Sequence, residues 1–64
     1  MSKNDIEFIK RSDKFIIIKD DKKYEFKMWS DAANFYNSNV STAKSIELSA
    51  ICGIVGKTIA YKYN

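Results

Sequence analysis

The small size of the chain, together with a lone cysteine, limits what it can fold into. Its 64 residues suffice for one domain with a small core, because a chain this short buries only about 60% of its unfolded surface. One cysteine and no histidine exclude an internal disulfide and the usual zinc ligand sets. Self-association is the remaining aid to stability in such a small chain. We therefore expect a single domain over residues 1–64, with no metal or other cofactor and with a tendency to form a homodimer.

Strand-like runs occupy residues 5–28. Ile6–Lys10, Lys14–Lys19 and Lys23–Met28 are rich in β-branched and aromatic residues, which favour strands. Residues 20–22, Asp-Asp-Lys, separate the second and third runs and are typical of a turn. The sequence therefore predicts an N-terminal strand followed by a β-hairpin.

The predicted hairpin has one apolar face. A turn centred on Asp21 and Lys22 pairs Ile17 with Phe26 and Phe15 with Met28, while Ile16 and Ile18 lie opposite Lys27 and Glu25 on the other face. Those two isoleucines suggest that this face is partly covered by Ile6 and Phe8, by the C-terminal strand or by another molecule. They are the first indication of an interface.

The second half of the chain has helical spacing of apolar residues. Ser30 is a predicted N-cap for a helix over residues 31–37, which the polar residues 37–39 would end. A second helix over residues 42–52 would turn Ala43, Ile46, Ala50 and Ile51 inward, leave Leu48 off this stripe and end at Gly53. Alternating residues at 57–63 then predict a C-terminal strand, with Ile59, Tyr61 and Tyr63 on one side.

These elements define an α+β fold. We expect a small antiparallel sheet, made of the hairpin and the N- and C-terminal strands, packed on a helix-turn-helix-like pair over residues 30–52. In a DNA-binding helix-turn-helix the second helix enters the major groove, and its N-terminal residues contact bases and phosphates. Here that helix would present Ser41, Thr42, Lys44 and Ser45. Asn39, Lys57 and Lys62 complete the predicted DNA-binding set.

A family resemblance points in the same direction. It lies in Tyr24-Glu25-Phe26, Ser30-Asp31-Ala32-Ala33, Phe35-Tyr36-Asn37, Val40-Ser41-Thr42, Ile46 and Tyr61-Lys62-Tyr63. This pattern, which covers about two-thirds of the chain, resembles the NUMOD-type modules, small helix-turn-helix units of phage homing endonucleases and short phage proteins. The resemblance implies a phage or mobile-element protein that contacts double-stranded DNA through the second helix and its preceding turn.

Two other interpretations of the helix pair stay open. It could serve only as the hydrophobic layer against the sheet. Alternatively, the chain could bind a protein, for example as a phage-encoded inhibitor of a host protein, through an apolar helix face or a sheet edge. The residues predicted for such an interface are Ile16, Ile18, Leu48, Ile51, Ile54 and Val55.

The remaining features of the sequence argue against other classes of function. The chain has no histidine, no phosphate-binding glycine loop and no metal-ligand cluster, so we expect neither an enzyme nor a small-molecule substrate. A net charge of +3 permits DNA or acidic protein partners without requiring either. No apolar run approaches the length of a membrane span, and an unpaired cysteine suits a reducing compartment, so the sequence predicts a cytoplasmic protein.

Overall fold

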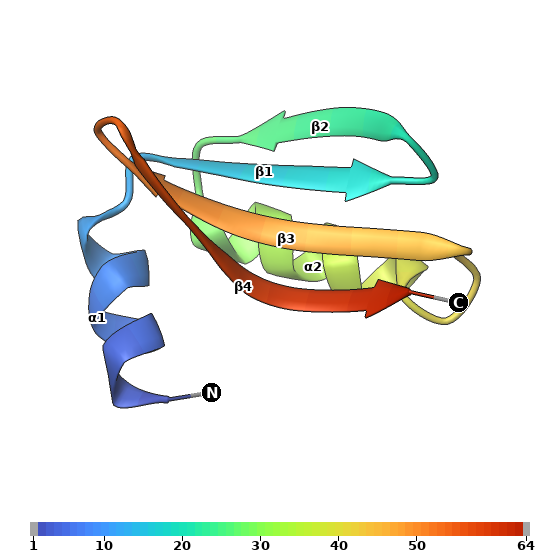
Figure 1. Cartoon of the computed structure of the whole chain (residues 1–64), viewed down its shortest axis with the longest axis horizontal. Coiled ribbons are helices and arrows are strands. Elements are labelled where there is room, and N and C mark those ends of the chain that lie inside the picture. Colours follow the sequence, from blue (N-terminus) through green and yellow to red (C-terminus); the bar gives the residue numbers. More distant parts are fainter. Residues whose placement is uncertain (1, 64) are drawn as a thin grey trace.

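The computed structural model describes residues 2–63 and consists of a four-stranded sheet and two helices (Figure 1). In chain order the elements are α1 (Lys3–Arg11), β1 (Lys14–Lys19), β2 (Lys22–Phe26), α2 (Trp29–Asn39), β3 (Ser45–Cys52) and β4 (Val55–Tyr63). The sheet is antiparallel with strand order β2-β1-β3-β4, and α2 lies across one of its faces (Figure 1). The predicted α+β class with an antiparallel sheet is thus confirmed, although several elements differ from the prediction.

The first difference is at the N-terminus, where the run predicted as a strand lies in helix α1. Ser2 Oγ accepts a hydrogen bond from the Asp5 amide at 3.2 Å, and Asp5 lies in the first turn while Lys10 and Arg11 lie in the last. Both ends therefore match the helix dipole. The run Ile6–Lys10 has three apolar side chains in five residues, a pattern that suits a strand or a helix. The Ser2 cap and the charged residues in the first and last turns favour the helix.

The hairpin of β1 and β2 is confirmed, but its register is shifted by two residues. The turn is centred on Asp20 and Asp21, which have φ angles of 49° and 70°, as two-residue hairpin turns of the type I′ class require. The strands pair Phe15 with Phe26, Ile16 with Glu25, Ile17 with Tyr24 and Ile18 with Lys23. A shift of two residues keeps every side chain on its predicted face, because the period of a strand is two.

Helix α2 is longer than predicted at both ends, since it spans Trp29–Asn39. Its N-cap is Met28, which makes no side-chain cap, so the prediction of Ser30 as N-cap is wrong. Ala32 is buried, and Phe35 and Tyr36 pack against the core, as their helical spacing predicted. The helix joins the hairpin to the second half of the sheet.

The second helix predicted over residues 42–52 is wrong, because this segment forms strand β3. Ile46, Leu48 and Ala50 are buried, whereas the residues between them are half-buried. The segment has apolar residues at both helical and alternating positions, and pairing with β1 on one side and β4 on the other decides for the strand. The structure therefore has no helix pair at residues 30–52.

A second hairpin links β3 to β4. Gly53 has a φ of 63° and lies in the turn between the two strands, not at a helix end as predicted. The predicted C-terminal strand is confirmed and begins two residues earlier, at Val55. A register shift pairs Ala60 with Leu48 but Thr58 with Ser49, so Ile59 is the extra residue of a β-bulge. The bulge separates Ile59, which packs on the core, from Tyr61 and Tyr63.

The core lies between the sheet and α2. Its buried residues, among those described, are Phe15, Ile17, Ala32, Ala43, Ile46, Leu48 and Ala50. Phe8 and Ile9 of α1 and Trp29 of α2 pack against this cluster, and Trp29 meets Phe15 edge-on at a centroid distance of 5.6 Å. Neither α1 nor α2 has the length and apolar character that a membrane span needs.

Candidate functional site

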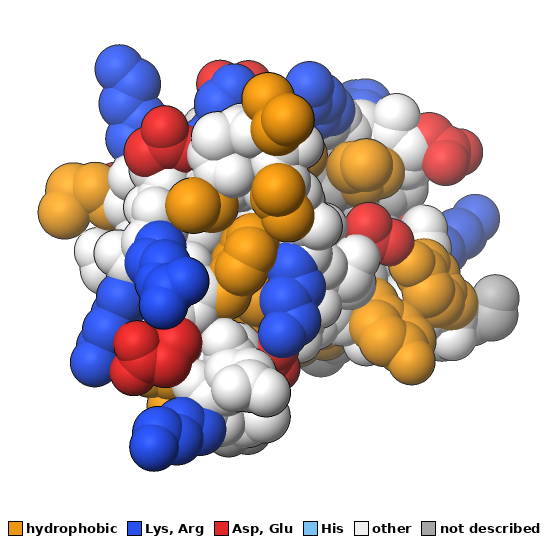
Figure 2. Space-filling model, turned by 60° about the vertical axis from the view of Figure 1, so that its left-hand side comes forward, with side chains coloured by type: hydrophobic (Ala, Val, Ile, Leu, Met, Phe, Trp, Pro, Cys, Tyr) orange, Lys and Arg blue, Asp and Glu red, His pale blue; other side chains and the backbone are white. Residues whose placement is uncertain are grey.

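Within residues 2–63, no helix lies over the face of the sheet away from α2 (Figure 1). Strand residues alternate between faces, so the neighbours of the buried residues point away from the core. We call the following set the open face: Lys14, Ile16 and Ile18 of β1, Lys23 and Glu25 of β2, Ser45, Glu47, Ser49 and Ile51 of β3, and Thr58, Tyr61 and Tyr63 of β4. Figure 2 shows hydrophobic side chains reaching the surface among side chains of both charges.

Strand pairing arranges the centre of the open face in two rows. One row crosses the sheet as Lys23, Ile18, Glu47 and Tyr61, and the next as Glu25, Ile16, Ser49 and Thr58. Each row therefore has a charged residue on β2 and an isoleucine on β1. Ile18 is 43% exposed, whereas Ile16 is half-buried by its neighbours.

The β4 side of the open face carries an ordered aromatic pair. The rings of Tyr61 and Tyr63 stack at a centroid distance of 5.2 Å and an interplanar angle of 30°. The Tyr63 hydroxyl donates a hydrogen bond to the Glu47 carboxylate, and this bond is the main reason that the pKa of Tyr63 is raised. Although both tyrosines are exposed, by 65% and 59%, their rings are thus held in place by each other and by Glu47.

The charges of the open face balance. Lys14 and Lys23 stand against Glu25 and Glu47, and Lys14 Nζ lies 3.5 Å from Glu25 Oε1. Since both partners of this pair are about half exposed, the pair adds little stability. A surface without net positive charge is unsuited to phosphate backbones, which bind through clustered lysine and arginine.

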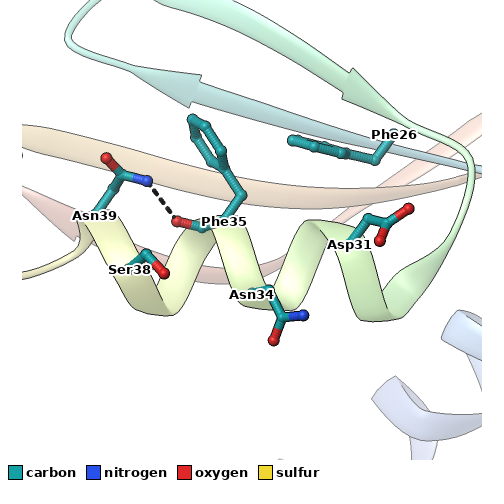
Figure 3. A pocket seen from close by; sticks show the side chains of 6 residues that line it. All are labelled: Phe26, Asp31, Asn34, Phe35, Ser38 and Asn39. Atoms are coloured by element: carbon teal, nitrogen blue, oxygen red, sulfur yellow. Dashed lines mark hydrogen bonds between the residues drawn. The ribbon is translucent and has the colours of Figure 1, made fainter.

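A shallow groove lies on the other side of the molecule, along α2 (Figure 3). It measures about 410 Å³ and is lined by Phe26, Asp31, Asn34, Phe35, Ser38 and Asn39. In Figure 3 the Phe35 ring points from α2 toward the sheet and the Phe26 ring extends from β2 toward Phe35, whereas Asn34 points away from the sheet. The Phe35 ring packs on Tyr24 and Phe26 at centroid distances of 4.7 and 5.3 Å. Because these rings belong to the core, the groove offers a ligand only a few separated polar groups.

Most residues predicted to bind DNA fall in one loop, but the helix meant to present them is absent. Asn39 ends α2, Ser41 and Thr42 are exposed in the following turn, Lys44 is exposed, and Ser45 begins β3. The Asn39 carbonyl accepts from the amides of Thr42 and Ala43 at 3.2 and 2.9 Å, and Asn39 Nδ2 donates to the Phe35 carbonyl at 2.7 Å. Asn39 therefore closes the helix end.

The two remaining residues predicted to bind DNA, Lys62 and Lys57, contact groups within the protein. Lys62 Nζ donates to the carbonyls of Val40 and Ala43 at 2.8 and 3.2 Å, so its charge lies beneath the loop. Lys57 Nζ lies 2.7 Å from Asp5 Oδ1 of α1. Lys57 pairs with Ala50, near the far end of β3 from Ser45, so it lies apart from the loop around Lys44.

The structure brings together half of the residues predicted for a protein interface. Ile16, Ile18 and Ile51 share the open face, and Ile54 and Val55 are exposed at the β3–β4 turn. Leu48 is only 2% exposed, so its assignment to an interface is wrong. The prediction missed the position of the two tyrosines, because nothing in the sequence marks the bulge that turns them outward.

Residues 2–63 contain no group of three or more His, Cys, Asp or Glu side chains that could hold a metal ion.

Comparison of the chain with known protein families, characterised proteins and solved structures finds no match. The resemblance to NUMOD-type modules therefore stays a prediction.

Proposed function

We propose that the chain is a non-enzymatic protein-binding module whose contact surface is the open face. The observation that carries this proposal is the exposure of Ile18, Tyr61 and Tyr63, at 43%, 65% and 59%, on a sheet face that α2 does not cover. Clustered exposed apolar side chains mark interaction sites, and aromatic residues are enriched in protein interfaces.

The order and charge of this surface also favour a protein partner. The stacked tyrosines are held by Glu47, so binding would cost little additional side-chain entropy. The two lysines and two glutamates leave no net charge, and an electrostatically mixed surface suits a protein better than a phosphate backbone.

The DNA-binding hypothesis has less support. Without a second helix, contact with duplex DNA would fall to the loop around Lys44, because Lys57 and Lys62 are engaged with Asp5 and with backbone carbonyls. A loop with one free lysine would neutralise about one phosphate. Such a contact is too weak to serve as a principal function.

Photocrosslinking tests the proposal. A photoreactive phenylalanine analogue replaces Ile18 on the open face or, in the matched control, exposed Asn37 on α2. We expect protein adducts from position 18 in the native cellular background and none from position 37. Absence of adducts at position 18, or equal adducts at both positions, would contradict the proposal.

A parallel titration with mixed-sequence duplex DNA tests the competing function. We expect no binding near about 50 mM salt, where electrostatic contacts are least screened. Binding that disappears in Lys44→Ala would instead support DNA contact through the loop.

A further inference from the structure

We propose that the open face pairs with the open face of a second copy of this chain, giving a two-fold symmetric dimer of stacked sheets. This inference rests on the proposed function, since it names the partner of the same surface. It follows from the chemical pattern of the two central rows, which is complementary to itself.

The rows become complementary under one particular symmetry operation. The two-fold axis lies between the stacked sheets, perpendicular to the strands and midway between the two rows. Rotation about it places the row of Ile18 in one copy over the row of Ile16 in the other copy, and the reverse. Ile18 then faces Ile16 of the second copy, and Lys23 faces Glu25, in both directions. The apolar centre and the opposite charges are thus matched twice in one interface.

The β3 and β4 residues fit the same operation. The Ser49 hydroxyl donates to the Glu47 carboxylate of its own chain at 3.4 Å, and the operation places Glu47 over Ser49 of the second copy, so these polar groups face each other across the interface; Tyr61 faces Thr58. No like charges oppose each other within the two rows. Sheets in stacked proteins keep their strands within about 30° of each other, so the central register survives the sheet twist.

The size of the face sets the expected affinity. Four strands about 4.8 Å apart and about six residues long at about 3.3 Å per residue give about 400 Å² of projected area per copy. Stable interfaces bury about 800 Å² per partner, and smaller ones are typical of transient complexes. We therefore expect a weak dimer that dissociates on dilution into the low micromolar range.

Sedimentation equilibrium over a concentration series tests for this dimer. The wild-type chain should approach twice its monomer mass as concentration rises, and Ile18→Glu should stay monomeric at every concentration. Ile18→Thr, which keeps a β-branched side chain, provides a second variant that should weaken the dimer without loss of the fold, as checked by circular dichroism. A dimer that persists unchanged in both folded variants would overturn the proposal.

Charge reversal tests the register itself. Lys23→Glu and Glu25→Lys should each weaken the dimer about tenfold, because every altered pair occurs twice by symmetry. The double variant Lys23→Glu/Glu25→Lys restores opposite charges across the axis and should recover most of the affinity. Lys10→Glu, on the exposed end of α1, is the matched control and should leave the dimer unchanged. Failure of the double variant to exceed the single variants would overturn the row-on-row arrangement.

The crosslinking experiment separates this inference from the proposed function. Adducts from position 18 that contain two copies of the chain support both. Adducts with a different protein, from a chain that sediments as a monomer at every concentration, would overturn the dimer and leave the proposed function standing. A monomer without any adducts would overturn both.

Discussion

Asp20 and Ser45, which are 25 residues apart in the chain, bind each other through two hydrogen bonds. The Asp20 amide donates to the Ser45 carbonyl at 3.0 Å, and Asp20 Oδ1 accepts from the Ser45 amide at 3.1 Å. The same carboxylate oxygen also accepts from the Lys44 amide at 2.9 Å. The turn between β1 and β2 thereby holds the start of β3 in place. The hydrogen bond from the Ser45 amide to the Asp20 carboxylate is the main reason that the pKa of Asp20 is lowered.

The lowered pKa of Asp20 predicts a loss of stability in acid. Its contribution is fully present above the unfolded value of 3.8 and is lost as the pH falls through the lower pKa of the folded state. Asp20→Asn, which cannot ionise, should lower the melting temperature at neutral pH, and the difference from wild type should shrink in acid. Thermal unfolding followed by circular dichroism across this pH range measures both effects.

Asp21→Asn is the matched control, since it makes the same charge change in the same turn and Asn tolerates the φ of 70° at this position. Its difference from wild type should be small. The pKa of Asp5 is lowered mainly by its hydrogen bond with Lys57. Asp5 therefore makes the stability of the wild type and of both variants fall in acid, and its effect cancels when they are compared. A constant difference between Asp20→Asn and wild type at every pH would contradict the role of the ionised carboxylate.

Lys62 should matter for stability. Replacing it by Met removes the ammonium group that binds the Val40 and Ala43 carbonyls, and we expect the free energy of unfolding to fall by about 1–2 kcal/mol. Urea unfolding of Lys62→Met measures this change, with Lys44→Met as the control for removal of an exposed lysine. Equal stability of the two variants would show that the loop does not depend on Lys62.

Leu48 distinguishes a strand from a helix at residues 45–52. In the structure its side chain is 2% exposed, so Leu48→Ala should cost about 2–5 kcal/mol. A domain of this size rarely has more than about 3–5 kcal/mol of stability, and circular dichroism should therefore show a large unfolded population. Ser49→Ala, on the open face, should stay folded. A neutral Leu48→Ala would favour the helix predicted from the sequence, which leaves this residue off the apolar stripe.

Gly53 should resist substitution because of its backbone conformation. Its φ is 63°, and a Cβ atom there would meet nothing within 4 Å, so Gly53→Ala tests the left-handed conformation alone. We expect a cost of about 1 kcal/mol. In Gly56→Ala the new Cβ would lie 3.1 Å from Ile51 Cδ1, the flexible end of a side chain, and the cost should be smaller. The reverse order of the two variants in urea unfolding would contradict the turn geometry.

The candidate site could be predicted only in part. Alternation in β1 placed Ile16 and Ile18 on the face opposite Ile17, and the structure confirms that face. The tyrosines of β4 could not be placed, because the bulge at Ile59 arises from pairing with β3 and leaves no local signature. The position of Lys62 beneath the loop could not be predicted either, since its partners at residues 40 and 43 are distant in sequence.

The sequence by itself determined the elements whose signals are local. The two aspartates specify a turn, the runs around them specify a hairpin, and the spacing of Ala32, Phe35 and Tyr36 specifies a helix. The local sequence of residues 45–52 does not distinguish a helix from a strand, because Ile46 and Ala50 fit both a helical stripe and an alternating strand. Only the tertiary structure made them β3, since the segment lies between β1 and β4 and the hydrogen bonds to two neighbouring strands outweigh its weak local preference. That choice removed the helix pair and left one face of the sheet open.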